Sequence, residues 1–375
     1  MRFLAALCIA LFSLVASAQN VPPPTVAAKA WLLLDHGSGQ VLASKDPDAR
    51  SEPASLTKLM TAYLTFAALK QGTLKLDQVV PVSTRAWKAQ GSRMFIAPDK
   101  PVTVDELIHG MIIQSGNDAC VALAEAIAGS EETFANLMNK EAQRLGMTNT
   151  HFTNAAGMPD PQHYTTARDL SKLVSALIRD FPEYYPIYSS KEYTYNKITQ
   201  PNRNRLLWLD QTVDGVKTGH TASAGYCLIS SAKRGPRRLI SVVLGTDSDN
   251  TRAQESLKVL NYGFQFFDTV KLYSANQGVS SFRVWKGAEN QLEAGFLEDF
   301  NLSLPKGQGE KVQATLTSIQ PLLAPIQKGQ KVGTLTLAVD GQNIGEYPVV
   351  ALKDVPVANW FGRLWDALIL WFKSL

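Results

Sequence analysis

Three short motifs in this 375-residue chain combine hydroxyl, amine and amide side chains at close spacing. The first is Ser55-Leu56-Thr57-Lys58. A serine hydroxyl is a weak nucleophile, and it becomes reactive when a base lies beside it. Residues three positions apart share one face of a helix, so a lysine amine at this spacing can reach the serine hydroxyl. The motif therefore places the Lys58 amine within reach of the Ser55 hydroxyl.

The Ser-x-x-Lys pattern alone carries little weight, because it also occurs at Ser230 to Lys233 and at Ser303 to Lys306. Pro305 excludes a helix interior in the third copy. The second copy runs off the end of an expected strand, where alternation places its two side chains on opposite faces. Only the first copy opens an expected helix, whose N-terminus favours negative charge developing nearby.

The second and third motifs are Ser115-Gly116-Asn117 and Lys217-Thr218-Gly219-His220. The second lies between two expected helices, where Asn117 could simply cap a helix. The third comes just before the expected strand at Gly225 and offers a charge, a hydroxyl donor and a close backbone approach, although it could be an ordinary strand edge. Ser248-Asp249-Asn250 also has the Ser-x-Asn form, but it follows the third motif and suits a polar turn. Only in this order and context do the three motifs predict one active site.

The elements that must position these motifs mix helices with antiparallel strands. Apolar periodicity predicts helices over residues 55–69, 104–113, 117–128, 131–145, 167–178 and 252–267. Strands are expected over 28–34, 41–44, 225–232 and 239–244. This order predicts an α+β domain, an antiparallel sheet with a large helical insertion, rather than an alternating βαβ array. The position of residues 83–101 relative to the site is left open by the sequence.

Four segments are expected along the chain: 1–18, 24–268, 269–354 and 355–375. The third has short alternating runs and a hairpin turn at Asp340-Gly341, which predict a small all-β domain. We expect this domain to act as a spacer, although it could instead only stabilise the first domain.

The first segment has the pattern of an export signal. Arg2 supplies a positive start, residues 3–15 form an apolar run, and Ala16-Ser17-Ala18 suits cleavage. This run is shorter than the roughly 20 residues that a membrane span needs.

The last segment is an expected amphipathic helix. Its apolar residues recur at steps of three and four, opposite Arg363, Asp366 and Lys373. Three of the seven tryptophans lie in this segment, and tryptophan prefers the headgroup layer of a membrane. We expect a peripheral membrane anchor. The alternative is a helix that docks its apolar face on the protein itself.

Composition narrows the functional classes further. The net charge of +4, from 37 basic and 33 acidic residues, does not suggest a nucleic-acid-binding protein. Cys8 falls in the signal, and Cys120 and Cys227 are expected to be buried thiols, although a pair is possible. The five histidines are scattered, so neither a metal site nor a cofactor is expected.

The three motifs, in this order, resemble those of the active-site serine penicillin-recognising enzymes. The runs LIHGMIIQSGNDACVALAEAIAG, NRNRLLW and VDGVKTGHTASAGYCLI resemble the low-molecular-mass penicillin-binding proteins that act as D-alanyl-D-alanine carboxypeptidases. The resemblance covers essentially the whole chain. It implies a penicillin-binding/serine β-lactamase-like catalytic domain, a small all-β domain and a membrane-associated terminal helix. It also implies a location at the periplasmic face of the bacterial inner membrane.

The resemblance also implies a reaction. Ser55 would attack the penultimate D-alanine carbonyl of a peptidoglycan stem pentapeptide, with Lys58 as base, and release the terminal D-alanine. Ser115 and Asn117 would complete the proton path and hold the substrate amide. The backbone N–H groups of Ser55 and His220 would form the oxyanion hole, and β-lactams would acylate the same serine. The residues implied to bind substrate are Lys217, Thr218, Gly219, His220 and Arg252.

Other readings of the same motifs stay open. Arg252 could be an ordinary surface charge. A class A β-lactamase shares the motifs, but it carries a deacylating glutamate, and no Glu-x-x-Leu-Asn pattern occurs between Asn117 and Lys217. A non-catalytic cell-wall scaffold could keep the fold, and a transpeptidase would use the same acyl-enzyme.

Overall fold

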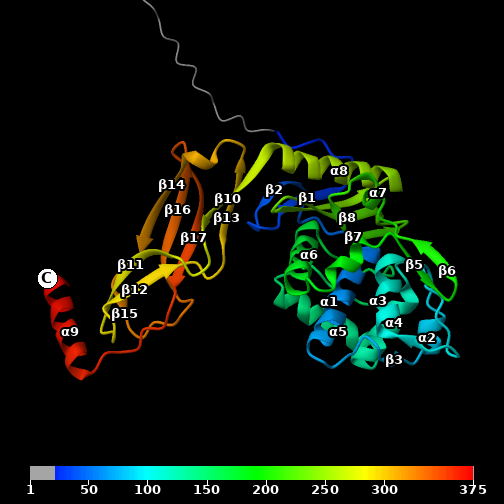
Figure 1. Ribbon diagram of the computed structural model, residues 1–375, viewed down its shortest axis with the longest axis horizontal. Helices are drawn as coiled ribbons and strands as arrows, with labels where there is room; N and C mark the ends of the chain where they lie inside the picture. Colours follow the sequence, from blue (N-terminus) through cyan, green and yellow to red (C-terminus); the bar gives the residue numbers. More distant parts are fainter. Residues whose placement is uncertain (1–21, 375) are drawn as a thin grey trace, which may run out of the picture.

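The computed structural model describes residues 22–374, so the expected export signal lies outside the described residues. Figure 1 shows a domain of mixed helices and strands, which is the expected catalytic domain, an elongated β domain beside it, and a terminal helix at the far end. This is the expected α+β architecture with a small all-β domain.

A five-stranded antiparallel sheet with strand order β2-β1-β9-β8-β7 forms the centre of the catalytic domain. The strands are β1 (Ala30–Asp35), β2 (Val41–Lys45), β7 (Val213–Thr221), β8 (Gly225–Arg234) and β9 (Arg237–Thr246). Because the helices that carry the first two motifs lie in sequence between β2 and β7, they form an insertion, as expected. The third motif lies within β7 itself, at the edge of the sheet, rather than just before a strand.

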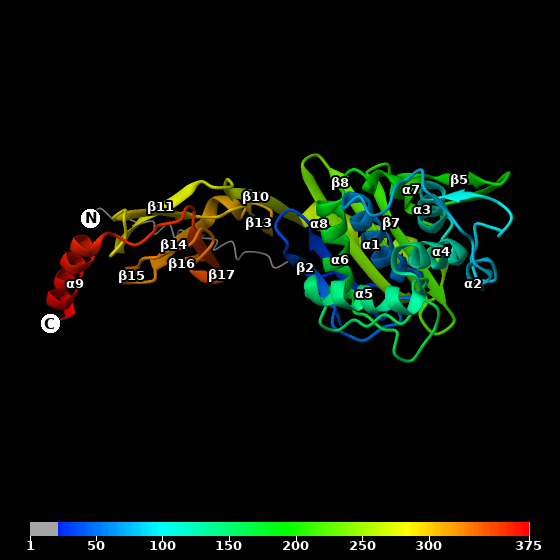
Figure 2. The same cartoon turned by 90° about the horizontal axis from the view of Figure 1, so that it is seen from below.

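Helices cover both faces of this sheet (Figures 1 and 2). The helices of this domain are α1 (Lys58–Lys70), α2 (Thr84–Trp87), α3 (Val104–Ile113), α4 (Asn117–Ala128), α5 (Glu131–Arg144), α6 (Ala167–Asp180), α7 (Leu206–Leu209) and α8 (Asp249–Phe266). Successive residues of β1 point to opposite faces. Leu32 and Leu34 therefore join the core under α1 and α6, while Trp31 and Leu33 join the core under α8.

Two expected helices begin elsewhere than the sequence pattern suggested. The helix expected from residue 55 starts with a 3₁₀ turn, η1 (Ala54–Thr57), and becomes α-helical at Lys58. The helix expected from residue 252 begins at Asp249, because the Ser248 side chain accepts a hydrogen bond from the Thr251 N–H and caps it. The Ser-x-Asn sequence at Ser248 is therefore a helix cap.

Short elements connect these helices. The two small hairpins are β3 (Val79–Val80) with β4 (Val102–Thr103), and β5 (Glu192–Tyr195) with β6 (Ile198–Pro201). A second 3₁₀ turn, η2 (Tyr185–Ser189), precedes β5.

The second domain is built from antiparallel strands, apart from one short parallel pair between β11 and β15. A two-stranded sheet joins β10 (Phe267–Tyr273) to β13 (Phe300–Pro305). A six-stranded sheet has the order β14-β16-β17-β12-β11-β15. Its strands are β11 (Gly278–Trp285), β12 (Gln291–Gly295), β14 (Val312–Ser318), β15 (Leu322–Leu323), β16 (Lys331–Val339) and β17 (Gln342–Ala351). A third 3₁₀ turn, η3 (Gly309–Lys311), precedes β14.

The expected hairpin turn lies between β16 and β17, where Asp340 and Gly341 both have positive φ angles. The chain ends in helix α9 (Trp360–Ser374).

A buried charge ties the two domains together. Asp35 is fully buried at the end of β1, and it accepts hydrogen bonds from Arg237 Nε at 2.9 Å and from Thr269 Oγ1 of β10 at 2.6 Å. Burial alone would raise the pKa of this carboxyl, but the bonds from Thr269 and Arg237 outweigh it and hold the pKa below its ordinary value. Beside this carboxylate, the hydroxyls of Ser38 and Ser303 form a hydrogen bond of 2.8 Å across the junction between the domains.

We expect Asp35→Asn to lower the free energy of unfolding by about 3 kcal/mol at neutral pH, because Arg237 would stay buried without its counter-charge. The folded-state pKa of Asp35 is depressed, so its stabilisation is present at neutral pH and is lost as the pH falls through that pKa. Urea unfolding of both proteins should therefore differ at pH 7 and converge in acid. The matched control is Asp299→Asn, which removes the charge of an exposed carboxylate that pairs with Lys271 and accepts a hydrogen bond from the Ala275 N–H. Equal stability of Asp35→Asn and wild type at pH 7 would contradict this account.

Candidate active site

The nucleophile candidate Ser55 lies in η1, wedged between β7 and the loop at residues 154–158. Two glycines permit this close packing. A Cβ on Gly157, which has a φ of +83°, would lie 1.8 Å from the Ala54 carbonyl oxygen, and one on Gly219 would lie 2.9 Å from the Pro53 carbonyl oxygen. The turn that carries Ser55 is therefore held from both sides by backbone.

Lys58 is the most constrained charged group of the site. Its side chain is buried, with 1% of the residue exposed. Its Nζ donates to Ser55 Oγ at 2.9 Å, to Asn117 Oδ1 at 2.7 Å and to the Ala156 carbonyl oxygen at 2.7 Å. Burial lowers the pKa of Lys58 to about 8, because the ammonium form loses its hydration. A substantial neutral fraction at physiological pH suits a general base.

The second motif faces Lys58 from the start of α4. Ser115 is buried and has a φ of +64°, a conformation that L-residues rarely adopt, and within residues 22–374 its Oγ has no hydrogen-bond partner. Such strain and an open hydroxyl are typical of functional positions. Asn117 is not a cap, because Gly116 holds the N-cap position. Its amide bonds Lys58 through Oδ1 and donates from Nδ2 to the Gln90 carbonyl at 2.5 Å.

Asp118, which the sequence analysis did not single out, anchors the loop at residues 83–101 against this motif. It is fully buried and accepts hydrogen bonds from the N–H groups of Met94 at 3.0 Å, Phe95 at 2.8 Å and Ile96 at 3.3 Å. The backbone N–H of Asn117 also donates to the Ser92 carbonyl at 2.6 Å. The loop is thus part of the wall of the site.

The third motif brings a second buried amine to the site. Lys217 is 3% exposed on β7. Burial, together with the charges of Lys58 and Arg203, holds the pKa of Lys217 well below its ordinary value. Thr218 beside it is also buried. Two buried lysines this close favour states in which they do not both carry charge, unless an anion binds between them.

Two arginines add positive charge around these lysines. Arg252 of α8 is 6% exposed, pairs with Asp249 and donates to the Gly219 carbonyl at 3.3 Å. It is therefore not a surface charge. Arg203 lies in the NRNRLLW run, and its charge contributes to lowering the pKa of Lys58, Lys217 and Arg252. Sequence reasoning quoted this run for its resemblance only and missed Arg203.

His220 is exposed at the end of the motif and packs on Tyr226, with ring centroids 4.0 Å apart.

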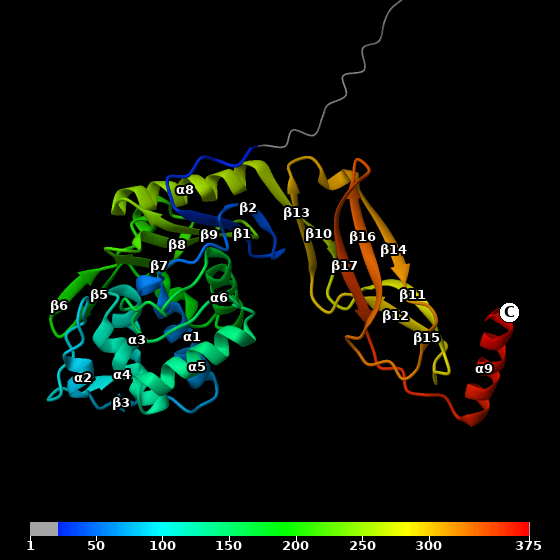
Figure 3. The same cartoon turned by 180° about the vertical axis from the view of Figure 1, so that it is seen from behind.

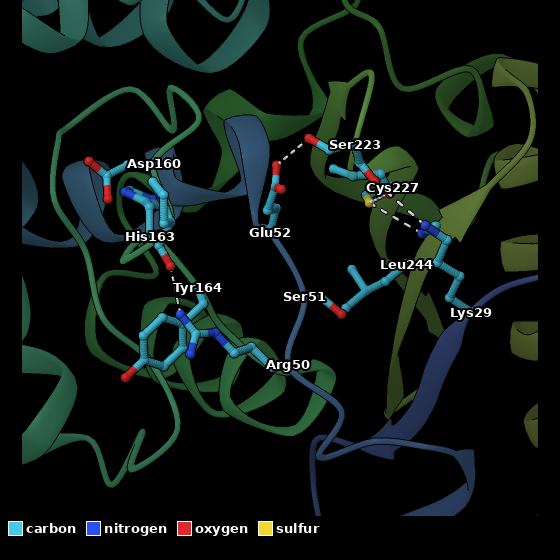
Figure 4. A pocket seen from close by; sticks show the side chains of 13 residues that line it. Lys29, Arg50, Ser51, Glu52, Asp160, His163, Tyr164, Ser223, Cys227 and Leu244 are labelled. Atoms are coloured by element: carbon cyan, nitrogen blue, oxygen red, sulfur yellow. Dashed lines mark hydrogen bonds between the residues drawn. The ribbon is translucent and has the colours of Figure 1, made fainter.

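Two cavities flank the site. One of about 700 Å³ opens beside the catalytic groups and includes Asn117, Ala156 and Met158 in its wall. The other, of about 420 Å³, lies under the chain that leads to Ser55 (Figure 4). In it Glu52 accepts a hydrogen bond from Ser223 Oγ at 2.6 Å, and Cys227 lines the wall. Cys120 and Cys227 are both free and buried, as expected.

The arrangement can carry out acyl transfer to a serine. A partly exposed hydroxyl contacts a buried amine of lowered pKa, and cationic groups nearby can receive a carboxylate. Within the part of the chain that the structure describes, no cluster of His, Cys, Asp and Glu could hold a metal ion. The fold and the site together have the features of a serine enzyme in which a lysine amine contacts the serine hydroxyl.

Comparisons with known proteins agree with this class. Residues 17–248 match a family described as D-alanyl-D-alanine carboxypeptidase, and residues 267–357 match the C-terminal domain of penicillin-binding protein 5. The chain is 45% identical over 371 residues to D-alanyl-D-alanine carboxypeptidase DacC of Escherichia coli, which covers 96% of this chain and 93% of that protein.

Solved structures are similar as well. Penicillin-binding protein 5 from Haemophilus influenzae has a TM-score of 0.85 and 42% identity, covering 90% of this chain and 99% of that one. Penicillin-binding protein D2 from Listeria monocytogenes, in an ampicillin-bound form, has a TM-score of 0.60 and 31% identity, covering 65% of this chain and 99% of that one.

The chain belongs to the D-alanyl-D-alanine carboxypeptidase family. It is a serine-type carboxypeptidase, and the family resemblance seen in the sequence is confirmed. The comparisons favour neither the β-lactamase nor the scaffold alternative.

The pKa of Lys58 gives a pH prediction. If neutral Lys58 is the base, the second-order acylation constant for a β-lactam should rise with pH and level off above the pKa of about 8 that Lys58 has in the free protein. The neutral fraction, and with it this second-order constant, should rise about 10-fold between pH 7 and pH 9. Stopped-flow fluorescence with a β-lactam that does not ionise in this range measures it. A flat profile with Lys58 intact would show that Lys58 is not the base.

Proposed function

We propose that Ser55 is the nucleophile that removes the terminal D-alanine from peptidoglycan stem pentapeptides. The observation that carries this proposal is the contact of Lys58 Nζ with Ser55 Oγ at 2.9 Å. Neutral Lys58 takes the hydroxyl proton as Oγ bonds to the carbonyl carbon of the penultimate D-alanine. The backbone N–H groups of Ser55 and His220 stabilise the resulting oxyanion by about 3 kcal/mol each.

The proton then passes to the departing amine, and terminal D-alanine leaves as the acyl-enzyme forms. Ser115 lies next to Asn117 with an uncommitted hydroxyl, which supports a role in this transfer. Asn117 can hold the substrate amide. Water hydrolyses the ester and regenerates Ser55.

The positive groups around β7 account for the requirement for a free carboxyl terminus. A carboxylate beside Lys217 and Thr218 would restore the charge on Lys217, because an anion favours the ammonium form. Gly219 keeps the backbone close to η1, and Arg252 and Arg203 reinforce the positive field. A substrate without a terminal carboxylate would lack this electrostatic attraction to the positive groups around β7.

A β-lactam presents a similar carboxylate and a strained amide, so it should acylate Ser55. The resulting acyl-enzyme should hydrolyse slowly. Among the described residues, Glu131 lines the 700 Å³ cavity beside Asn117, where a deacylating glutamate would have to lie. Both of its oxygens are occupied: Oε1 accepts from the Ala155 N–H at 3.0 Å and Oε2 from Arg85 at 2.7 Å. It is therefore poorly placed to activate water.

The acyl-enzyme can be tested by intact-protein mass. Mature protein exposed to benzylpenicillin should gain one adduct, and Ser55→Ala should gain none while keeping its melting temperature. The wild type should also release D-alanine from a pentapeptide that ends in D-Ala-D-Ala, and not from the corresponding tetrapeptide. A labelled Ser55→Ala variant, or a folded wild type without an adduct, would refute the assignment.

We also propose that the enzyme is exported and rests on the periplasmic face of the inner membrane through α9. Within residues 22–374, no helix is long and apolar enough to cross a membrane. The apolar face of α9 is exposed, with 75% of Phe361 and 66% of Trp365 accessible.

The opposite side of α9 holds the helix to the β domain, because Asp366 is buried and accepts a hydrogen bond from the Lys286 N–H at 2.5 Å. The exposed apolar face therefore supports a membrane anchor over the alternative in which this face docks on the protein. The β domain lies between α9 and the catalytic domain (Figure 3), which supports its role as a spacer.

Membrane attachment should depend on apolar burial rather than charge. Mature protein should sediment with phosphatidylcholine vesicles at low and at high salt, and Leu364→Ser with Trp365→Ser should lose most of this binding. Trp208→Ser, which alters an exposed tryptophan of the catalytic domain, is the matched control. Binding that survives the double substitution, or that disappears in high salt, would contradict the proposal.

A further inference from the structure

The orientation of Lys58 depends on acceptors other than Ser55. An ammonium has three N–H donors, and Lys58 Nζ has three partners. When Lys58 is neutral it has two N–H donors and one lone pair. If Asn117 and the Ala156 carbonyl take the two donors, the lone pair points to Ser55 Oγ. The Ala156 carbonyl therefore helps to orient the lone pair of neutral Lys58 toward Ser55 Oγ.

The position of that carbonyl is set by the peptide unit before it. The Ala155 carbonyl accepts from Thr61 Oγ1 at 2.7 Å, one turn beyond Lys58 on α1. The Ala155 N–H donates to Glu131 Oε1 at 3.0 Å. Residues after it are held by Asn154 Oδ1, which accepts from the N–H groups of Gly157 at 2.7 Å and Met158 at 2.9 Å. Thr61 thus holds the Ala155 carbonyl, and Glu131 holds the Ala155 N–H.

Glu131 is an unusual residue for this place. It is the first residue of α5, only 7% exposed, and its second oxygen accepts from Arg85 of α2 at 2.7 Å. Burying a carboxylate is costly unless it is paired and hydrogen-bonded. Its neighbour Glu132 also pairs with Arg85, at 2.6 Å, but 67% of its side chain is exposed. Of the two partners of Arg85, Glu131 is the one that bonds the loop at 154–158.

We propose that Glu131 is a positioning residue for the catalytic base: it fixes Ala155, so that the Ala156 carbonyl directs the lone pair of neutral Lys58 at Ser55. The chain of contacts runs from Arg85 through Glu131 to the loop and from there to Lys58. This role rests on the proposed function, in which Lys58 is the base, and it goes beyond the three motifs.

The test compares isosteric substitutions at Glu131. Glu131→Gln keeps an oxygen for the Ala155 N–H, whereas Glu131→Met has similar length, excludes water and offers no acceptor. We expect Glu131→Met to lower the acylation constant at saturating β-lactam by on the order of 10-fold, and Glu131→Gln to stay within about 3-fold of wild type. The loss should persist on the plateau above the pKa of Lys58, where protonation no longer limits the rate. A merely structural role would lower the melting temperature and leave this plateau unchanged.

Two further variants complete the design. Glu132→Met is the matched control and should acylate like wild type. Thr61→Val removes the hydrogen bond to the Ala155 carbonyl and should slow acylation several-fold. This variant tests the role of the Ala155 contacts if Glu131→Met does not fold.

The inference would be overturned by a wild-type plateau in folded Glu131→Met, by an equal loss in Glu131→Gln, or by an unchanged Thr61→Val. If the wild type itself took up no adduct at Ser55, the proposed function would fail instead.

Discussion

The contact between Lys58 and Ser55 is the constraint on which the rest of the catalytic domain depends. A lysine this deeply buried must either find acceptors for all of its N–H groups or lose its proton. Lys58 does both in part, because it has three oxygen partners and a pKa lowered to about 8. The proposed role of Lys58 needs this intermediate state, since a fully stabilised ammonium would be no base and an unpaired amine would not be oriented.

Maintaining that state requires segments far apart in the sequence to meet at one amine. Residues 83–101 are pulled in by Asp118, and residues 154–158 are held through Ala155. On the opposite side, β7 approaches the turn at Ser55 through Gly219 and brings Lys217 near Lys58. The charge of Lys58 helps to lower the pKa of Lys217, and the charge of Arg203 helps to lower the pKa of Lys58. If a terminal carboxylate binds among these positive groups, as proposed, substrate binding would be coupled to the charge of both lysines through the same field.

The sequence was sufficient to predict the sheet with a helical insertion, the small β domain and the terminal helix, and to select the serine and lysine that the fold brings into contact. These depend on local patterns: helical spacing at Ser55, strand alternation and apolar periodicity near Trp365. It could not predict what depends on backbone atoms or distant contacts. The Ala156 carbonyl has no side-chain signature, Asp118 resembles an ordinary helix-start residue, and the motif at Lys217 lacks the alternation that reveals a strand. Arg203 is recognisable only once folding brings it to the lysines.

The junction between the domains limits how far the catalytic domain can turn relative to the terminal helix. A flexible linker would let the catalytic domain sample many orientations above a membrane, whereas the buried pair of Asp35 with Arg237, bonded across to Thr269, ties β10 to the catalytic sheet. At the other end, Asp366 ties α9 to the β domain. Because buried carboxylates tie both ends of the β domain, binding of α9 to a membrane surface, as proposed, would also set the direction in which the active site faces its substrate.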